Sequence, residues 1–134
     1  MNTPGSAPKR ILVVDDEPFV CETVKLLLAF DGHAVETATS GKEALEKFSS
    51  GKFDLVITDY SMPEMKGDEL GLELKARVPD QPVVLITAYA EMLRGAESPV
   101  LGVDCMISKP FLLDDLRQAI ASTARQREDT PAVT

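Results

Sequence analysis

Short apolar runs alternate along this chain with segments of helical period, a pattern that predicts a parallel sheet covered by helices. Four runs, at residues 11–14, 54–58, 82–86 and 103–108, are each followed by a polar residue: Asp15-Asp16, Asp59, Thr87 and Lys109. The carboxyl ends of parallel strands meet at one edge, where open α/β sheets hold their functional residues. The sequence therefore predicts that three carboxylates, a hydroxyl and an ammonium group lie close together.

The predicted architecture is a (βα)5, doubly wound, flavodoxin-like α/β fold, with five parallel strands in the order 2-1-3-4-5. The runs at 11–14, 55–58 and 83–86 are continuously apolar, as strands covered on both faces are, and the second strand is expected at about 33–38. Right-handed crossovers then place the ends of the first and third strands side by side at the topological switch point.

Five helices are expected between the strands. Pro18 opens the first, in which apolar residues recur with a helical period from Phe19 to Phe30, and Asp31-Gly32 ends it. Ser40 and Glu43 match a capping box at the start of the second. The others are expected at about residues 67–78, at 90–97, where helix propensity is weak, and from about 112.

Length, composition and charge restrict the class of protein. The 134 residues indicate one domain at 9–125, with residues 1–8 and 126–134 predicted to be disordered. No apolar stretch reaches the roughly 20 residues of a membrane span and no signal peptide is apparent, so a cytoplasmic location without a membrane partner is expected. Cys21 and Cys105 are expected to be free thiols, and His33 to be structural. The net charge of −8 argues against direct nucleic-acid binding.

The three carboxylates of Asp15, Asp16 and Asp59 would repel one another unless a cation joined them. A hard divalent ion such as Mg²⁺ prefers oxygen ligands. We expect Asp16 and Asp59 to bind it directly and Asp15 to act through a water molecule. Lys109 balances the remaining charge, because three carboxylates, one divalent ion and one ammonium group sum to zero.

Four segments together resemble the receiver domain of bacterial response regulators, of the chemotaxis-regulator type. They are residues 11–18 (ILVVDDEP), 58–63 (TDYSMP) with Gly67, 85–88 (LITA) and 108–111 (SKPF). The resemblance covers about residues 9–124. It implies a phosphoprotein of two-component signal transduction, in which Asp59 accepts a phosphoryl group from a histidine kinase with the help of Mg²⁺ or Mn²⁺.

The resemblance also implies roles for individual residues. The backbone carbonyl of Ser61 would complete the metal ligands, and Lys109 would stabilise the phosphoryl oxygens. Thr87 would be the switch, donating a hydrogen bond to a phosphoryl oxygen, and Pro110 would follow a cis peptide bond. Asp59 needs no general base, because an ionised carboxylate has no proton to lose. The domain would be a signalling switch that assists only its own phosphorylation and dephosphorylation, and no metabolic enzyme.

One position departs from the family pattern. Many receivers carry Tyr or Phe three positions before the lysine, where this chain has Met106. Methionine fills similar space without an aromatic edge or a hydroxyl, so coupling of this position to Thr87 is in doubt. Tyr89 is the nearest aromatic alternative, and we expect it to gate water at the acyl phosphate.

The expected partners also come from the resemblance. A histidine kinase or phosphotransfer protein would dock near the first helix, and a downstream effector protein or domain would dock on the fourth helix, fifth strand and fifth helix. A homodimer stays open, because Arg94, Asp104 and Arg117 could pair across a symmetric face, although ordinary surface charge explains them equally well. The chain fits a stand-alone regulator, a piece of a longer protein or part of a hybrid kinase.

Two alternatives stay open. An aspartyl-phosphate phosphohydrolase usually carries a second aspartate two positions after the nucleophile, but this chain has Ser61 there. A phosphorylation-independent pseudo-receiver would have lost part of the acceptor site, whereas Asp16, Asp59, Thr87 and Lys109 are all present.

Overall fold

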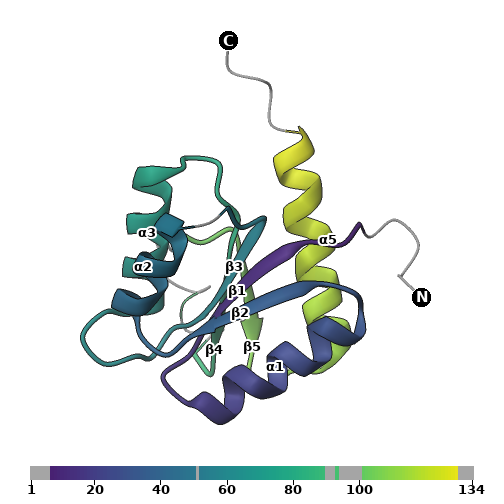
Figure 1. Ribbon diagram of the computed structural model, residues 1–134, viewed down its shortest axis with the longest axis horizontal. Helices are drawn as coiled ribbons and strands as arrows, with labels where there is room; N and C mark the ends of the chain where they lie inside the picture. The colour runs from purple at the N-terminus through teal and green to yellow at the C-terminus, as the bar shows by residue number, and fades with distance from the viewer. Residues whose placement is uncertain (1–6, 51, 90–92, 94–100, 130–134) are drawn as a thin grey trace.

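Strands and helices alternate as the sequence pattern indicates. The structure is a computed structural model that describes residues 7–50, 52–89, 93 and 101–129 (Figure 1). Its elements are β1 (Arg10–Val14), α1 (Pro18–Phe30), β2 (Ala34–Ala38), α2 (Gly41–Ser50), β3 (Leu55–Asp59), α3 (Gly67–Arg77), β4 (Val83–Thr87), β5 (Cys105–Ser108) and α5 (Leu113–Asp129). The helix predicted at 90–97 lies outside the described residues, apart from Leu93.

The five strands form one parallel sheet in the order β2-β1-β3-β4-β5, which confirms the predicted topology. Val14 pairs with Thr58, so the end of β1 lies beside the end of β3. Thr87 pairs with Ser108, so β4 and β5 also end together. This register gathers the residues that follow these strands at one edge of the sheet.

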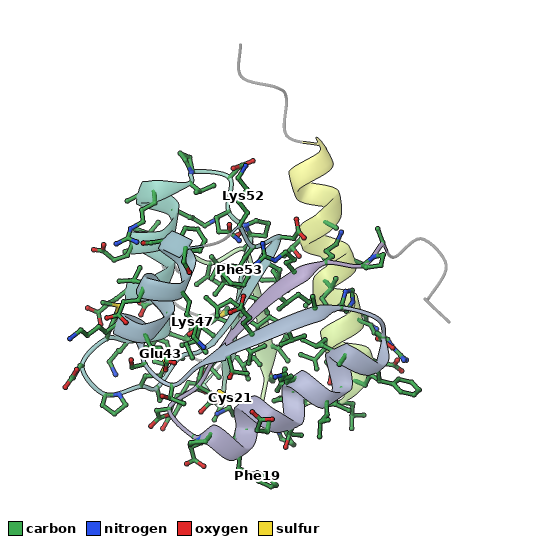
Figure 2. All side chains as sticks on the ribbon, viewed as in Figure 1. Phe19, Cys21, Glu43, Lys47, Lys52 and Phe53 are labelled. Atoms are coloured by element: carbon green, nitrogen blue, oxygen red, sulfur yellow. The ribbon has the colours of Figure 1, made fainter. Side chains whose placement is uncertain are left out.

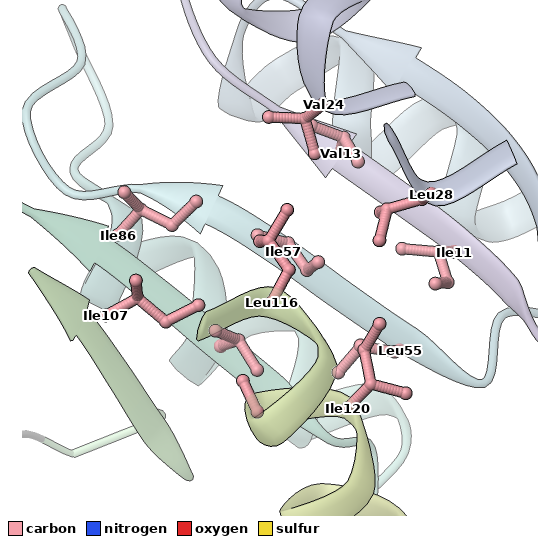
Figure 3. Packing of buried hydrophobic residues seen from close by; sticks show 12 residues of the cluster. Ile11, Val13, Val24, Leu28, Leu55, Ile57, Ile86, Ile107, Leu116 and Ile120 are labelled. Carbon is pink, nitrogen blue, oxygen red and sulfur yellow. The ribbon is translucent and has the colours of Figure 1, made fainter. Parts of the chain in front are cut away.

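Apolar side chains fill the space on both faces of the sheet. On one face α1 and α5 pack against the strands through Val24, Leu28, Leu116 and Ile120 (Figure 3). On the other face Ala44 and Phe48 of α2 and Leu70 and Leu74 of α3 pack against Leu12, Val14, Val56 and Val83. Figure 1 shows the sheet between these two helical layers. Because both faces are covered, every residue of β3 and β4 is buried, as their continuous apolar runs predict.

The helix ends match the local sequence signals. Pro18 occupies the first turn of α1, and Gly32 follows the helix with a φ of 92°, a conformation that glycine adopts at no steric cost. At the start of α2 the Ser40 hydroxyl accepts a hydrogen bond from the Glu43 N–H at 3.0 Å. The Glu43 carboxylate reaches back to the N–H of Thr39 at 2.8 Å, one residue before the expected capping-box partner.

Three details differ from the sequence predictions. Helix α5 continues to Asp129, beyond the predicted boundary at residue 125. The fifth strand begins at Cys105, two residues after the start of its predicted run at Val103. Phe19 and Phe30 belong to the helical period of α1 but are 81% and 78% exposed, because Val24 and Leu28 occupy the face toward the sheet. Figure 2 shows Phe19 pointing away from the body of the protein.

Two residues considered for a symmetric interface form ion pairs within the chain. Asp104 pairs with Lys75 at 2.7 Å, and Arg117 donates two hydrogen bonds of 2.8 Å to the carboxylate of Asp31. Arg94 lies outside the described residues. Asp104 and Arg117 are therefore explained by intramolecular contacts.

The cysteines and the histidine have structural surroundings. The two cysteines form no disulfide bond, and Cys21 is buried whereas Cys105 is half-buried. The Cys21 thiol donates to the backbone carbonyls of Asp15 and Ala38, and burial raises its pKa to about 11. His33 is buried just before β2, and its Nδ1 accepts a hydrogen bond from the Lys9 N–H at 3.1 Å.

Across the described part of the chain, none of the helices combines the length and the apolar character that crossing a bilayer requires.

Candidate functional site

Three aspartates from two neighbouring strands meet at the carboxyl edge of the sheet. Asp15 and Asp16 directly follow β1, and Asp59 is the last residue of β3. One carboxylate oxygen from each lies within 4.8 Å of the corresponding oxygens of the other two. Asp15 and Asp59 are buried, whereas Asp16 is exposed, so the cluster opens to solvent on one side.

A lysine from a more distant strand joins this cluster. Lys109 follows β5, and its Nζ lies 2.6 Å from Oδ1 of Asp59. Because β4 lies between β3 and β5 in the sheet, the ion pair depends on the length of the lysine side chain. The Lys109 N–H donates to the Thr87 carbonyl at 3.0 Å, which anchors the backbone, and the Lys109–Pro110 peptide bond is cis, as predicted.

The electrostatics of the cluster disfavour three ionised carboxylates without a cation. Burial raises the pKa of Asp15 to about 6. The hydrogen bond that Asp15 accepts from the Glu17 N–H, at 2.9 Å, lowers this pKa, while the charge of Asp59 raises it further. For Lys109, burial by itself lowers the pKa, but the hydrogen bond to Asp59 and the three negative charges raise it overall.

The donor set fits a hard divalent cation. Mg²⁺ binds in proteins through one or two carboxylates, waters and substrate oxygens, and it favours the ionised form of each carboxylate. Asp15, Asp16 and Asp59 supply oxygen donors at a half-open position, which leaves room for water and for a further ligand. Ser61 lies two residues after Asp59 and is exposed; the part of its carbonyl in metal binding stays a prediction.

The remaining predicted site residues lie on the neighbouring strands. Thr87 ends β4 and is buried, and its hydroxyl oxygen accepts a hydrogen bond from the Tyr89 N–H at 2.9 Å. The Tyr89 side chain is half-exposed, and its backbone N–H makes this hydrogen bond to Thr87. Met106 is half-buried on β5, opposite Leu85 of β4.

The amino-acid sequence did not lead us to predict two features of the site. A Cβ placed on Gly67 would collide with the backbone carbonyl of Asp59, so α3 begins directly against the backbone at the end of β3. Glu64, in the loop between Asp59 and Gly67, has a φ of 70°. A glycine after a strand, such as Gly67, weakly indicates that another backbone segment approaches closely. A glutamate such as Glu64 gives no indication of a positive φ, because non-glycine residues seldom adopt one.

A parallel five-stranded α/β sheet with this acidic cluster and lysine at its carboxyl edge defines the receiver class of signalling domains. The family model of the response regulator receiver domain matches residues 11–121, and the chain belongs to this family. It is thus a receiver domain homologous to response regulators of two-component signalling.

Curated relatives include several longer regulators. The response regulator MprA of Mycobacterium sp. (strain KMS) is 33% identical over 132 residues, covering 95% of this chain and 57% of MprA. The transcriptional regulatory protein ZraR of Escherichia coli (strain K12) is 38% identical over 128 residues, covering 92% of this chain and 29% of ZraR. The chain therefore spans about half, or less, of the length of these relatives.

Solved structures agree with the fold. The response regulator TrrA of Thermotoga maritima, in complex with Mg²⁺–BeF, is 39% identical with a TM-score of 0.77, covering 86% of this chain and 98% of TrrA. The chemotaxis response regulator CheY4 of Vibrio cholerae is 28% identical with a TM-score of 0.78, covering 87% of this chain and 99% of that one.

Proposed function

We propose that Asp59 accepts a phosphoryl group from a histidine kinase or phosphotransfer protein, in the presence of Mg²⁺ or Mn²⁺, and that phosphorylation switches a protein-interaction surface. The observation that carries this proposal is the buried carboxylate of Asp59, held between Lys109 and the carboxylates of Asp15 and Asp16. The complex of TrrA with Mg²⁺–BeF supports the choice of cation.

In the proposed transfer, a carboxylate oxygen of Asp59 attacks the phosphorus atom and forms an acyl phosphate, while the bond from phosphorus to the donor breaks. An ionised carboxylate nucleophile has no proton to lose, so no general base is required. Asp15, Asp16 and Asp59 would hold the cation, which would supply positive charge to the phosphoryl oxygens. Lys109 already contacts Asp59, and its ammonium group turns from the carboxylate to a phosphoryl oxygen as negative charge accumulates there.

The switch would begin at Thr87. Its hydroxyl oxygen accepts the hydrogen bond from Tyr89, which leaves the hydroxyl proton free to be donated. Donation to a phosphoryl oxygen would draw the end of β4 toward Asp59 and change the backbone that begins at Tyr89. The phosphoryl group thereby acts on the protein surface beyond β4. The chain would assist its own phosphorylation and dephosphorylation and would turn over no metabolite.

Helix α1 is the surface at which we place the phosphoryl donor. Phe19, Leu26 and Phe30 share one helical face and are 81%, 70% and 78% exposed. This face begins next to the acidic cluster, because α1 starts two residues after Asp16. A helical donor that packs its apolar side chains here would bring its phosphoryl group to the carboxyl edge of the sheet.

The downstream partner would be an effector protein or domain that recognises the region around β5 and α5. We further propose a cytoplasmic location, a receiver unit at about residues 9–125, and no direct contact with nucleic acid, in keeping with the net charge of −8. We also propose that the chain can form a homodimer, and we assign no residues to its interface.

The direct test is labelling by acetyl phosphate, read as the fraction of phosphorylated chain on a phosphate-affinity gel. We expect labelling with Mg²⁺, none with EDTA, and none for Asp59→Asn. Asp54→Asn is the matched control, because Asp54 precedes the same strand at its opposite end and accepts a hydrogen bond from the Arg10 N–H. Labelling that persists in Asp59→Asn would place the acceptor elsewhere and refute the proposal.

A further inference from the structure

The single histidine of this chain is buried where α1 leads into β2. The ring Nδ1 of His33 accepts a hydrogen bond from the Lys9 N–H at 3.1 Å. The backbone N–H of His33 donates to the Leu28 carbonyl at 3.2 Å, and the N–H of Ala34 donates to the Lys9 carbonyl at 2.9 Å. His33 therefore joins the end of α1 to the residue that precedes β1.

The hydrogen bond from Lys9 requires a neutral imidazole ring. A neutral ring has one nitrogen that accepts and one that donates, whereas both nitrogens of a protonated ring donate. Because Nδ1 of His33 accepts from Lys9, the proton of the neutral ring is on Nε2. Protonation would place an N–H on Nδ1 opposite the N–H of Lys9, and two donors repel each other. The charged form of the ring therefore cannot keep this contact.

The neighbouring charges centre on Asp31, which directly follows α1. Arg117 of α5 holds the Asp31 carboxylate through two hydrogen bonds of 2.8 Å, where the end of α1 lies against the start of α5 (Figure 1). Arg117 also pairs with Asp114 of its own helix at 3.3 Å. The charge of Asp31 favours a proton on His33, whereas the charge of Lys9 disfavours one. A protonated ring and the guanidinium group would thus compete for one carboxylate.

Burial has the largest influence on the ring. It lowers the pKa of His33 below the ordinary value of 6.5, because the charged ring would lose its hydration, and the opposing effect of Asp31 is smaller. Arg10 and Glu36, which pair at 3.5 Å, lie on the face of the sheet covered by α2 and α3, because side chains alternate along a strand. They therefore do not face the ring.

We propose that His33 is a pH-sensitive joint: protonation of its ring releases Lys9 from the end of α1 and draws the Asp31 carboxylate away from Arg117. The Asp31–Arg117 pair joins the first two turns of α5 to the end of α1, so its weakening loosens α5 against the sheet. The residues involved lie outside the acidic cluster, and the inference does not depend on phosphorylation of Asp59.

The ring can be titrated in the unchanged chain, because no other histidine contributes a signal. The measurement follows the Cε1–H resonance of His33 and the amide resonance of Lys9 by NMR between about pH 8 and pH 4.5. We expect a ring midpoint below 6.5 and a Lys9 amide that shifts with the same midpoint. A ring midpoint at or above 6.5, or a Lys9 amide that does not follow the ring, would overturn the proposal.

The Nε–H of Arg117 reports the effect on α5, because its hydrogen bond to Asp31 protects it from exchange with water. His33→Gln keeps an acceptor oxygen in the side chain and takes up no proton in this pH range. At about pH 5 we expect exchange of this N–H to be on the order of fivefold faster in the unchanged chain than in His33→Gln, and equal in the two at about pH 7.5. Equal exchange at the lower pH would refute the link to α5.

Urea unfolding distinguishes the charge of the ring from its packing. The folded state binds the His33 proton less tightly than the unfolded state does, so stability is lost as the pH falls below 6.5. Between about pH 7.5 and pH 5 we expect the urea midpoint of the unchanged chain to fall relative to that of His33→Gln. His33→Leu, which has neither acceptor nor charge, is the matched control and should differ from His33→Gln by a constant amount.

Other groups that titrate in this range, such as Asp15, are common to all three chains and cancel in the comparison. A difference between the unchanged chain and His33→Gln that does not vary with pH would show that the ring acts only by packing. If neither variant folds, the titration of the ring and of the Lys9 amide in the unchanged chain decides the proposal.

Discussion

Nζ of Lys109 lies 2.6 Å from Oδ1 of Asp59, although the strands that carry these residues are not neighbours in the sheet. The lysine side chain spans the end of β4 to reach the buried carboxylate. Among the described residues, Lys109 contributes the single ammonium group that faces the three aspartates. It also places a hydrogen-bond donor where negative charge would develop during phosphoryl transfer.

Replacement of this ammonium group should slow labelling more than it affects the fold. We expect Lys109→Met to reduce the initial rate of labelling by acetyl phosphate roughly 100-fold, because a donor to the developing charge is lost while the apolar stem is retained. The measurement is the time course of phosphorylation at saturating Mg²⁺. Lys42→Met, on the exposed surface of α2, is the matched control. A rate for Lys109→Met within about twofold of the unchanged chain would contradict the assigned role.

The pKa of Asp15 predicts how stability depends on pH without a cation. Its folded-state pKa is about 6, above the ordinary value of 3.8, so the folded state binds this proton more tightly than the unfolded state does. The stabilising contribution is therefore complete below pH 3.8 and is lost as the pH rises through 6. In EDTA at about pH 7.5, we expect Asp15→Asn to raise the free energy of unfolding by on the order of 2 kcal/mol.

Urea unfolding of both chains at two pH values checks this prediction. The advantage of Asp15→Asn should shrink as the pH falls toward 4, and in Mg²⁺ it should reverse, because the unchanged chain gains stability from the bound cation. An advantage of equal size at both pH values would show that desolvation of the ionised carboxylate is not the cause.

The ring of Tyr89 should control the lifetime of the acyl phosphate. Its backbone N–H, which bonds to Thr87, is retained in Tyr89→Ala, so that variant removes only the half-exposed ring. We expect the dephosphorylation rate to change roughly threefold or more, because the ring limits the access of water, while the Kd for Mg²⁺ stays within about twofold. Tyr89→Phe should behave like the unchanged chain. Equal effects of Tyr89→Ala on rate and affinity, or no effect on rate, would be evidence against gating.

The apolar face of α1 should affect the rate of phosphotransfer from a protein donor but not the rate of labelling by a small-molecule donor. We expect Leu26→Glu to slow phosphotransfer from a cognate kinase or phosphotransfer protein about tenfold or more, because a charge would enter the apolar contact. Labelling by acetyl phosphate should be unchanged, and so should stability, within about 0.5 kcal/mol, since Leu26 is 70% exposed. Lys25→Glu, beside it on the helix, is the control for charge alone. Parallel losses with both donors would place the effect in the site and not in docking.

Much of the fold could be predicted from local patterns. The apolar runs of β1, β3 and β4, the Pro18 and Gly32 signals of α1, and the parallel topology all follow from properties of short segments. The acidic cluster was predictable for the same reason, because the carboxyl ends of parallel strands meet at one edge. The helical period of α1 predicted a helix but not the exposure of Phe19 and Phe30, since several apolar side chains compete for the face toward the sheet.

The sequence by itself determined which polar side chains stand at the carboxyl ends of the strands: the carboxylates at the ends of β1 and β3, the Thr87 hydroxyl and the Lys109 ammonium group. Only the tertiary structure decided that Lys109 crosses β4 to Asp59, that burial raises the pKa of Asp15 to about 6, and that Glu64 adopts a left-handed backbone in the loop before α3. Each of these depends on distances between segments far apart in the chain and on the water excluded between them. Such quantities come into existence only when the sheet and its helices pack together.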